Sequence, residues 1–237
     1  MDADTFLSKN YIEEILKPFA DEKTAISTGI STPVKSPNFQ GEILYYGSIF
    51  QYLFFCFRKQ AQSYRNAVSV VCGDSAAYRT SFLKKMNGFP QGTVTEDMDI
   101  TWKALEEGNK IIFCKKAKAD SQDASTFKGS WKQITRWYRG GFQCLVIHNK
   151  ELLKAKPLFF TSLLPTYVDS IFYSFFFLMA IPSLYFFPAF GKGFLVADFI
   201  FTSVAIVYID WKFFFHLVEI YFIKVFWSLA YLFALIK

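Results

Sequence analysis

The sequence predicts an α/β domain followed by helices that cross a membrane. Over the first 156 residues, segments expected to form strands alternate with segments expected to form helices, which is typical of an α/β domain. The whole formal net charge of +6 lies in this first part. From Pro157 onward the chain consists mainly of Phe, Leu, Ile, Tyr and Ala. We therefore expect a first domain over residues 1–156 and a membrane region over residues 157–237.

Two helices and one strand are expected in the first sixty-odd residues. An apolar stripe predicts the first helix, and its members are Leu7, Tyr11, Ile12, Ile15, Leu16 and Phe19. Residues Lys23 to Thr32 are expected to form a strand, and the loop STPVKSPN follows it. An aromatic stripe from Tyr46 to Phe57 then predicts an amphipathic helix. This helix fits either the surface of a membrane or a buried core.

The second half of the α/β domain carries four further elements. Ala67 to Cys72 is expected to form a short apolar strand, and Thr80 to begin a short helix that Gly88 ends. Thr95 precedes a helix with acidic residues in its first turn and Gly108 after its last. A strand is expected from Lys110 to Lys116.

Three apolar runs follow in the membrane region. Residues Ser170 to Phe190 are uncharged and long enough to cross a hydrocarbon core of about 30 Å at about 1.5 Å per residue. The run from Gly193 to Ile209 carries only Asp198. The run from Phe213 to Ile236 carries His216, Glu219 and Lys224. Because a central charge costs about 2.5–3.5 kcal/mol on insertion, this third run fits either a span or a helix in the membrane interface.

The flanking charges and the cysteines predict where the first domain lies. Lys154 and Lys156 precede the first apolar run, so the basic domain is expected on the cytoplasmic side. The four cysteines, Cys56, Cys72, Cys114 and Cys144, form no CxxC pair and suggest neither a zinc site nor a disulfide framework. The basic charge fits contact with anionic lipid and an anionic substrate, and we expect no nucleic-acid partner.

A pair of carboxylates near the first residue is a candidate metal site. Asp2 and Asp4 lie one residue apart in the segment DADT. At the end of a strand, two such carboxylates can converge on Mg²⁺ or Mn²⁺, a cation that keeps several waters and bridges substrate phosphates. A solvated terminus carries the same pattern, so the pair is weak by itself.

The segment Thr95-Glu96-Asp97 is a candidate for acid–base chemistry. A carboxylate in the first turn of a helix is expected to stay ionised, because the free amides and the helix dipole favour its charge. A positioned, ionised carboxylate can take a proton from an attacking hydroxyl, an effect of about 10²–10⁴-fold in rate. Ordinary acidity at a helix N-terminus would explain this segment when it is taken alone.

The segment QITRW is expected to mark an active site. On a helix, Gln133, Arg136 and Trp137 share one face. A largely separate apolar stripe, made of Trp131, Ile134, Tyr138, Phe142 and Leu145, explains the helix but not this face. An Arg fork suits a diphosphate, and a Trp ring offers a flat face to a sugar. Gly140 and Gly141 are expected to end the helix and to allow close backbone approach.

These motifs occur in an order that resembles a known family. DxD, TED, QxxRW and apolar runs follow one another as in the processive inverting family-two glycosyltransferases, which are the cellulose, chitin, hyaluronan and poly-N-acetylglucosamine synthases. The resemblance covers nearly the whole chain. The segment VVCGDSAAYRTSFLKKMNGFP is similar to the family's segment before TED, and TEDMDITWKALEEG and TRWYRGG are nearest to bacterial poly-N-acetylglucosamine synthases. The implied fold is a partial GT-A, Rossmann-like domain followed by transmembrane helices.

The resemblance implies a role for each motif residue. Asp97 would be the catalytic base that deprotonates the acceptor hydroxyl. Asp2 and Asp4 would be the metal ligands, with Asp4 the direct one. The residues implied to bind substrates are Glu96, Gln133, which positions donor and acceptor, Arg136, which holds the leaving diphosphate, Trp137, which lies under the terminal sugar, and Cys72 and Gly73, which lie beside the acceptor.

The implied reaction is a single displacement with inversion that elongates a β-linked polysaccharide. Its donor would be a nucleotide sugar, expected to be UDP-linked, and its cofactor Mg²⁺ or Mn²⁺. The other implied partners are the growing polysaccharide acceptor and the lipid bilayer. The expected location is the plasma or inner membrane, with the catalytic domain in the cytoplasm.

The sequence departs from the family pattern at its start. The family's donor-binding half lies before DxD, and the strand that DxD ends needs about five residues before it. Only Met1 precedes Asp2 here. We therefore expect the chain to be truncated at its N-terminus.

Two alternative functions remain open on the sequence. The first is a non-processive glycosyltransferase that adds one sugar to a lipid acceptor. The second is a non-catalytic membrane fragment that has kept the motifs. If the product passes through the bilayer, polar residues of the apolar runs are pathway candidates, since such groups rarely face lipid. These candidates are Asp169, Asp198, His216 and Glu219.

Overall fold

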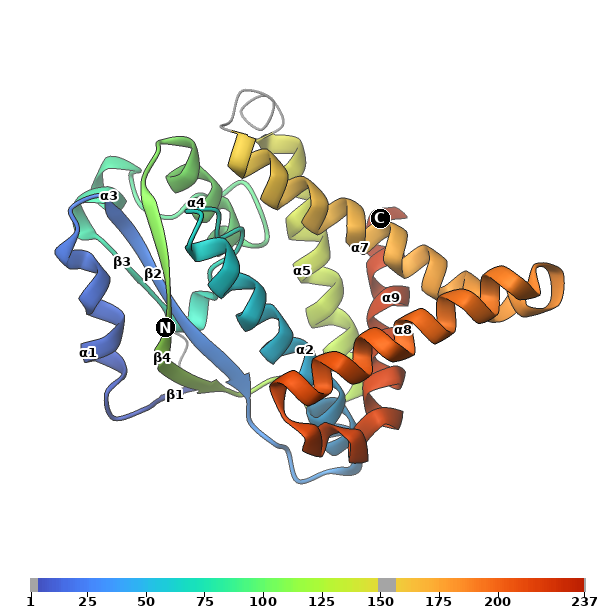
Figure 1. Cartoon of the computed structure of the whole chain (residues 1–237). Coiled ribbons are helices and arrows are strands. Elements are labelled where there is room, and N and C mark those ends of the chain that lie inside the picture. Colours follow the sequence, from blue (N-terminus) through green and yellow to red (C-terminus); the bar gives the residue numbers. More distant parts are fainter. Residues whose placement is uncertain (1–3, 149–156, 237) are drawn as a thin grey trace. The chain divides into compact units, whose positions relative to one another are not determined.

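The computed structural model describes residues 4–148 and 157–236, with side chains for residues 4–148 and 170–236 (Figure 1). Asp2, Lys154 and Lys156 lie outside the described residues, and so does the side chain of Asp169. The chain forms two compact units, and each is described by itself. Unit 1 comprises Met1–Val34, Phe55–Asp123 and Arg139–Pro165, and unit 2 comprises Lys35–Phe54, Ala124–Tyr138 and Thr166–Lys237.

Unit 1 contains a mixed sheet in the order β1-β4-β2-β3. The strands are β1 (Thr5–Leu7), β2 (Thr24–Pro33), β3 (Ala76–Tyr78) and β4 (Lys110–Ser121). The two central strands, β2 and β4, run parallel, while β1 and β3 pair antiparallel at the two edges. The strands expected at residues 23–32 and 110–116 are confirmed, and β4 extends further than expected. The α/β prediction is therefore confirmed.

Helices cover both faces of this sheet (Figure 1). They are α1 (Tyr11–Leu16), which continues as the 3-10 turn η1 (Lys17–Ala20), α3 (Thr80–Lys85) and α4 (Glu96–Glu106), with the 3-10 turn η2 (Gly73–Ser75) before β3. On one face, Tyr11 and Ile15 of α1 pack on Ala117 and Ala119 of β4. On the other face, the hydrophobic core gathers Ala25, Ile26, Val68, Val71, Phe82, Ile100, Ala104 and Ile111. Ile100 and Ala104 of α4 belong to this core, so α4 is packed against the sheet.

The glycines expected to end two helices do so. Gly88 follows α3 with a φ of +91°, and Gly108 follows α4 with a φ of +76°. Both values lie in the left-handed region, where glycine carries no Cβ penalty. The helix that carries the TED segment therefore begins and ends where the sequence predicts.

Residues 67–72 are buried but do not form the expected strand. Three of their backbone amides donate to side chains instead of to a neighbouring strand. The amide of Ser69 donates to Gln62 Oε1, that of Val71 to Thr101 Oγ1, and that of Cys72 to Thr28 Oγ1. The prediction was wrong because an apolar run indicates burial but does not say which groups satisfy its backbone.

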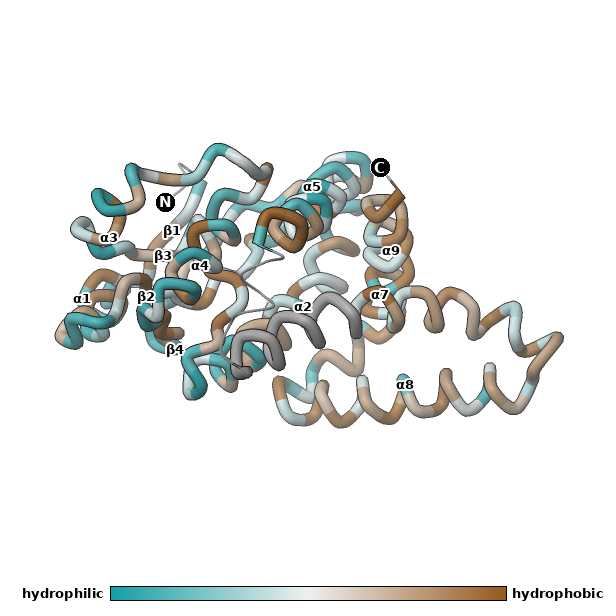
Figure 2. The backbone as a smooth tube through the Cα atoms, turned by 90° about the horizontal axis from the view of Figure 1, so that it is seen from above, coloured by the Kyte–Doolittle hydropathy of each residue, from teal (hydrophilic) through white to brown (hydrophobic). Residues whose placement is uncertain are grey.

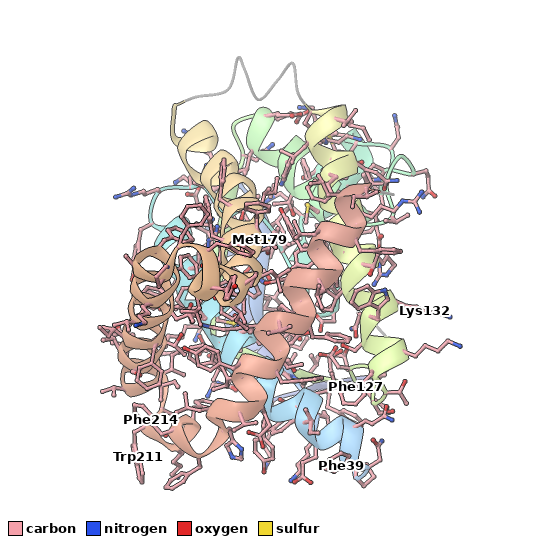
Figure 3. All side chains as sticks on the ribbon, turned by 90° about the vertical axis from the view of Figure 1, so that its right-hand side faces the viewer. Phe39, Phe127, Lys132, Met179, Trp211 and Phe214 are labelled. Carbon is pink, nitrogen blue, oxygen red and sulfur yellow. The ribbon has the colours of Figure 1, made fainter. Side chains whose placement is uncertain are left out.

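Unit 2 is a bundle of helices. It contains α8 (Pro188–Ile209), the 3-10 turn η3 (Trp211–His216) and α9 (Leu217–Ile236). It also contains the part of α7 (Pro157–Phe186) from Thr166 onward and the first parts of α2 (Phe39–Ser63) and α5 (Phe127–Ile147). One cluster joins α2, α5 and α9 through Leu44, Ile134, Ile223, Trp227 and Ala230. Figure 3 shows Phe127, which packs against Phe222 and Phe226, and the exposed Lys132, which points away from the bundle.

The aromatic face of α2 is mostly used inside this unit. Phe50 is buried with Ile206 and Ile220, and Phe54 contacts the ring of Phe201. Of the two environments that the sequence left open for this stripe, the structure favours a packed core for the part of α2 within unit 2.

The first apolar run is divided by Pro188. Helix α7 ends at Phe186, and α8 begins at Pro188 after Phe187, whose φ of −138° and ψ of 66° are not helical. Proline has no N–H to continue a helix, its ring crowds the residue before it, and its fixed φ suits a first helical position. The expectation of one continuous run from Ser170 to Phe190 was therefore wrong.

Two helical segments among the described residues are long and apolar enough to cross a membrane, judged by length and composition. They are Pro188–Ile209 and Trp211–Ile236, while Ser170–Phe186 is a shorter apolar helix. Figure 2 shows mainly hydrophobic residues along α8 and along the coloured part of α7. The third run, which the sequence left open between span and interface helix, is thus long enough to span.

A buried ion pair joins α8 to α9. Lys224 Nζ lies 3.0 Å from both carboxylate oxygens of Asp198 and also donates to Thr202 Oγ1. The hydroxyl of Tyr173, on α7, donates to Asp198 Oδ1 over 2.8 Å. The two charges are 7% and 8% exposed, and each has a partner. Asp198, a pathway candidate in the sequence, is thus engaged in helix packing.

Candidate functional site

Asp97 lies in the first turn of α4, where its carboxylate is held by two backbone amides. Oδ1 accepts a hydrogen bond from the amide of Met98 over 2.8 Å. Oδ2 accepts one from the amide of Gly73 over 3.2 Å. Unit 1 therefore brings together the TED segment and the Cys72-Gly73 turn, which lie more than twenty residues apart in the chain. The predicted roles of these residues toward substrates stay predictions.

The pKa of the Asp97 carboxyl lies above its ordinary value, contrary to the expectation from the helix dipole alone. Burial is the main cause, since it disfavours the charged form. The bonds from Met98 and Gly73 and the nearby Lys59 oppose burial, while Glu96 adds to it. A raised pKa makes Asp97 a stronger base than an exposed aspartate, which suits proton abstraction at neutral pH.

Two further polar residues line the same turn and have no motif of their own. Lys59, from the part of α2 in unit 1, donates from Nζ to the Cys72 thiol over 2.8 Å. Asp74 accepts a hydrogen bond from the Ser31 hydroxyl through Oδ2, and its Oδ1 is buried without a hydrogen-bond partner among the described residues. Sequence reasoning missed Lys59 because it stands in the polar segment RKQAQSYRN, which gives no sign that one lysine is buried.

The end of α5 that belongs to unit 1 packs on the segment before Asp97. The side-chain amide oxygen of Gln143 accepts a hydrogen bond from the Val94 amide over 3.0 Å. A Cβ added to Gly140 would lie 2.1 Å from Thr95 Oγ1, so only glycine allows this approach. The expected close approach at Gly140 is confirmed. The expectation that Gly140 and Gly141 end the helix was wrong, because α5 continues to Ile147.

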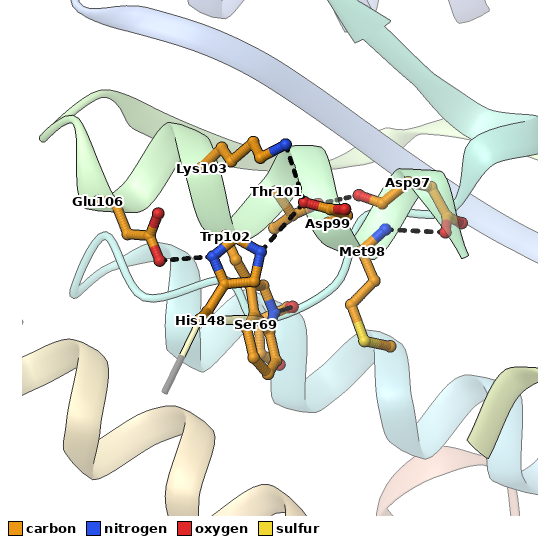
Figure 4. A network of polar contacts seen from close by, with 9 residues as sticks. All are labelled: Ser69, Asp97, Met98, Asp99, Thr101, Trp102, Lys103, Glu106 and His148. Carbon is orange, nitrogen blue, oxygen red and sulfur yellow. Dashed lines mark hydrogen bonds and ion pairs between the residues drawn. The ribbon is translucent and has the colours of Figure 1, made fainter. Parts of the chain in front are cut away.

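His148 closes the contact between α5 and α4 through two carboxylates (Figure 4). Its Nδ1 lies 2.6 Å from Glu106 Oε1, and its Nε2 lies 3.0 Å from Asp99 Oδ1. The imidazole ring is only 3% exposed and packs edge-on against Trp102, whose indole N–H donates to the Ser69 carbonyl. His148 therefore has a structural role in fixing α4.

We expect the unfolding free energy to fall more steeply from pH 6.5 to 9 in the wild type than in His148→Gln. Burial alone would lower the pKa of His148, but the bonds to Asp99 and Glu106 raise it from 6.5 to about 9. A raised folded-state pKa gives stability that is fully present below the unfolded value and lost as pH rises through the folded value. Chemical denaturation followed by tryptophan fluorescence at several pH values measures this, and identical pH dependence in both proteins would contradict it.

The QITRW segment lies on α5 within unit 2. Trp137 is half-buried, contacts the ring of Tyr52 edge-on with centroids 6.3 Å apart, and packs against the cluster around Ile134. Gln133 Oε1 accepts a hydrogen bond from the Ala124 amide over 3.4 Å, and Arg136 is exposed. Trp137 thus shares the packing of the apolar stripe from which the sequence largely separated it.

Asp4 is exposed and comes directly before β1. Among the described residues, no group of three or more His, Cys, Asp or Glu side chains could hold a metal ion. A cation at Asp4 would therefore take most of its ligands from substrate phosphates and water, which is the way Mg²⁺ is usually bound. The carboxylate fits such an ion, and its role stays a prediction.

The mixed sheet with helices on both of its faces has the GT-A fold. A solved mannosyltransferase, PcManGT from Pyrobaculum calidifontis in complex with GDP-Man and Mn²⁺, matches all of this chain and 60% of its own length, with a TM-score of 0.61 and 16% identity. The chain belongs to the family described as glycosyl transferase family group 2, whose profile matches residues 1–236.

Curated relatives include bacterial polysaccharide synthases at low identity. The chain is 25% identical over 164 residues to the poly-β-1,6-N-acetyl-D-glucosamine synthase of Staphylococcus aureus, which covers 67% of this chain and 39% of that protein. It is 28% identical over 100 residues to the synthase of the same name from Staphylococcus epidermidis, covering 42% and 24%. The chain thus spans well under half the length of these relatives.

Proposed function

We propose that this protein elongates a β-linked polysaccharide at a membrane, transferring sugars from a nucleotide-sugar donor with inversion. The observation that carries the proposal is Asp97, a half-buried carboxylate with a raised pKa held beside the Cys72-Gly73 turn. The family membership and the N-acetylglucosamine polymer synthases among the relatives support the reaction class. The two apolar helices support the membrane location.

Asp97 acts as the general base in this proposal. An acceptor hydroxyl attacks the anomeric carbon of the donor, and its proton passes to the Asp97 carboxylate. The new bond joins the acceptor oxygen to that carbon, while the bond from the carbon to the diphosphate breaks. Attack from the face opposite the leaving group inverts the anomeric configuration. The nucleoside diphosphate leaves with the bonding electrons.

The other motif residues handle the substrates. Arg136 holds the departing diphosphate with its planar fork, Trp137 lies under the terminal sugar, and Gln133 positions both substrates. Glu96, Cys72 and Gly73 lie on the acceptor side. Asp4, together with Asp2, would hold Mg²⁺ or Mn²⁺, which neutralises the charge of the diphosphate when bound. The donor is proposed to be UDP-linked.

The product separates this function from single-sugar transfer. Membranes that contain the protein expressed from its own gene are incubated with radiolabelled UDP-N-acetylglucosamine and, separately, with labelled GDP-mannose, with and without EDTA. We expect EDTA-sensitive incorporation from the UDP-linked donor into material that runs as a polymer on a sizing gel. A lipid-soluble product carrying one sugar would overturn the polymerising function. Incorporation from GDP-mannose alone, or from neither donor, would overturn UDP-N-acetylglucosamine as the donor.

A further inference from the structure

Lys59 is a buried cation with a weak partner. Its side chain lies on α2 within unit 1, is 9% exposed in total, and reaches the Cys72 thiol. Removing an ammonium from water costs several kcal/mol unless partners replace the water. A thiol sulfur is a weak hydrogen-bond acceptor and replaces little of that water. The carboxylate of Asp74 also attracts this ammonium, and it belongs to the same turn as Cys72.

The position of the ammonium relative to Asp97 supplies a reason for a lysine here. Lys59 Nζ lies 2.8 Å from Cys72 Sγ, and the next residue, Gly73, donates its amide to Asp97 Oδ2. The cation, the turn and the carboxylate thus form a continuous series of contacts within unit 1. Asp74, the next residue of the turn, brings a second carboxylate whose Oδ1 is buried without a partner among the described residues.

We propose that Lys59 is a positioning residue for the acceptor side of the site, where its ammonium stabilises the ionised form of Asp97 and holds the Cys72-Gly73 turn against it. This inference rests on the proposed function, because it assigns the base role to Asp97. It adds a residue that none of the sequence motifs contains.

The charges around Asp97 determine what the loss of Lys59 would do. The titratable groups that act on this carboxylate or on its turn include Glu96, Lys59, Cys72, Asp74, Tyr78, Tyr11, Cys56 and Cys144. Among them Lys59 is the cation, and its attraction holds the pKa of Asp97 below the value that burial and Glu96 would otherwise give it. Without the ammonium, Asp97 would stay protonated to higher pH and could not accept a proton there.

The first test compares sugar transfer by Lys59→Met, Lys59→Arg and the wild type across a pH series. We expect the acid limb of kcat/KM to move to higher pH in Lys59→Met and to stay near the wild-type position in Lys59→Arg, which keeps the charge. Lys85→Met serves as the control, because Lys85 is exposed and pairs with Glu107. An unchanged acid limb in Lys59→Met would overturn the proposal.

The second test measures the effect of the Lys59 charge on Cys72 and does not depend on sugar transfer. Cys72 is half-buried, and burial raises the pKa of its thiol while Lys59 lowers it. The rate of Cys72 alkylation by iodoacetamide is measured against pH by mass spectrometry of the Cys72 peptide. In Lys59→Met the apparent pKa should rise by about one unit or more, since an opposite charge in contact is typically worth that much. An unchanged alkylation profile would show that the ammonium does not act on this turn.

The two readouts separate the two proposals. If the wild type transfers no sugar, the proposed function fails, while the alkylation profile still decides whether Lys59 acts on the turn. Thermal unfolding of each variant identifies loss of the fold. If Lys59→Met does not fold, the alkylation measurement is made on Lys59→Arg instead. If the alkylation profile of Lys59→Arg matches the wild type, the proposal is supported. If the apparent pKa of Cys72 rises in Lys59→Arg by the amount expected for complete loss of the charge, the proposal is overturned.

Discussion

Asp97→Asn should lower the rate of glycosyl transfer by about 10²–10⁴-fold, the usual size of a general-base effect. The asparagine has nearly the same shape, and its amide oxygen can still accept one of the two hydrogen bonds from Met98 and Gly73. The variant cannot accept the acceptor's proton. The fold and the binding of donor should therefore survive while turnover is lost.

Initial rates with a labelled nucleotide sugar measure this effect, and binding of the unlabelled donor by calorimetry tests whether the site remains intact. Asp120→Asn is the matched control, because Asp120 is exposed and bonds only to the Thr32 hydroxyl among the contacts described. Transfer by Asp97→Asn within about tenfold of the wild type would exclude the base role.

The wild-type rate should also fall at acid pH, through a pKa above the ordinary aspartate value. Because burial raises the pKa of Asp97, its base form is lost at a higher pH than that of an exposed aspartate. The same rate series, extended to acid pH, follows this limb. This fall in rate reports protonation of the base, so it tests the same role as Asp97→Asn.

Gly140→Ala should reduce the rate of glycosyl transfer by about 10²-fold and lower the free energy of unfolding by about 1–3 kcal/mol. The added Cβ would lie 2.1 Å from Thr95 Oγ1 and 2.4 Å from Thr95 Cγ2, so Thr95 must move. Thr95 is the residue directly before α4, and Asp97 follows two residues later. A displacement of about 1 Å near reacting groups can cost about 10²-fold in rate, whereas overpacking costs about 1–3 kcal/mol in stability.

Gly193→Ala is the control for this substitution. Gly193 also lies in a helix, and nothing lies within 4 Å of the position where its Cβ would be. Alanine there should leave transfer unchanged and add slightly to helix stability. Thermal unfolding and transfer rates are measured for both variants. Full activity in a folded Gly140→Ala would show that Thr95 does not position the base.

Much of the α/β fold follows from the sequence because its elements have strong local signals. The strand at β2 and the helix α4 are bounded by polar turns and by Gly108, so pattern and termini agree. Residues 67–72 were misassigned for a physical reason. The apolar side chains determine that this segment is buried. Strand pairing depends instead on which groups hydrogen-bond to its backbone, and here the side chains of Gln62 and Thr101 accept these bonds.

Only those residues of the site that belong to sequence motifs could be predicted. The resemblance implied that Cys72 and Gly73 lie beside the acceptor, and the structure brings Gly73 into contact with Asp97. Lys59 and Asp74 carry no such signal, because the burial of a single charged side chain depends on tertiary packing. The direction of the pKa shift at Asp97 was missed for the same reason, since the helix dipole is a local effect and burial is not.

If α8 and α9 cross a bilayer as proposed, Asp198 and Lys224 make these helices costly to insert one at a time. A lone aspartate or lysine at the centre of a span costs about 2.5–3.5 kcal/mol on insertion. The two helices follow each other in the chain, and their side chains neutralise each other over 3.0 Å. Insertion as a hairpin therefore avoids most of the cost that stepwise insertion would impose. In the proposed membrane-bound form, the ion pair thus favours insertion of α8 together with α9.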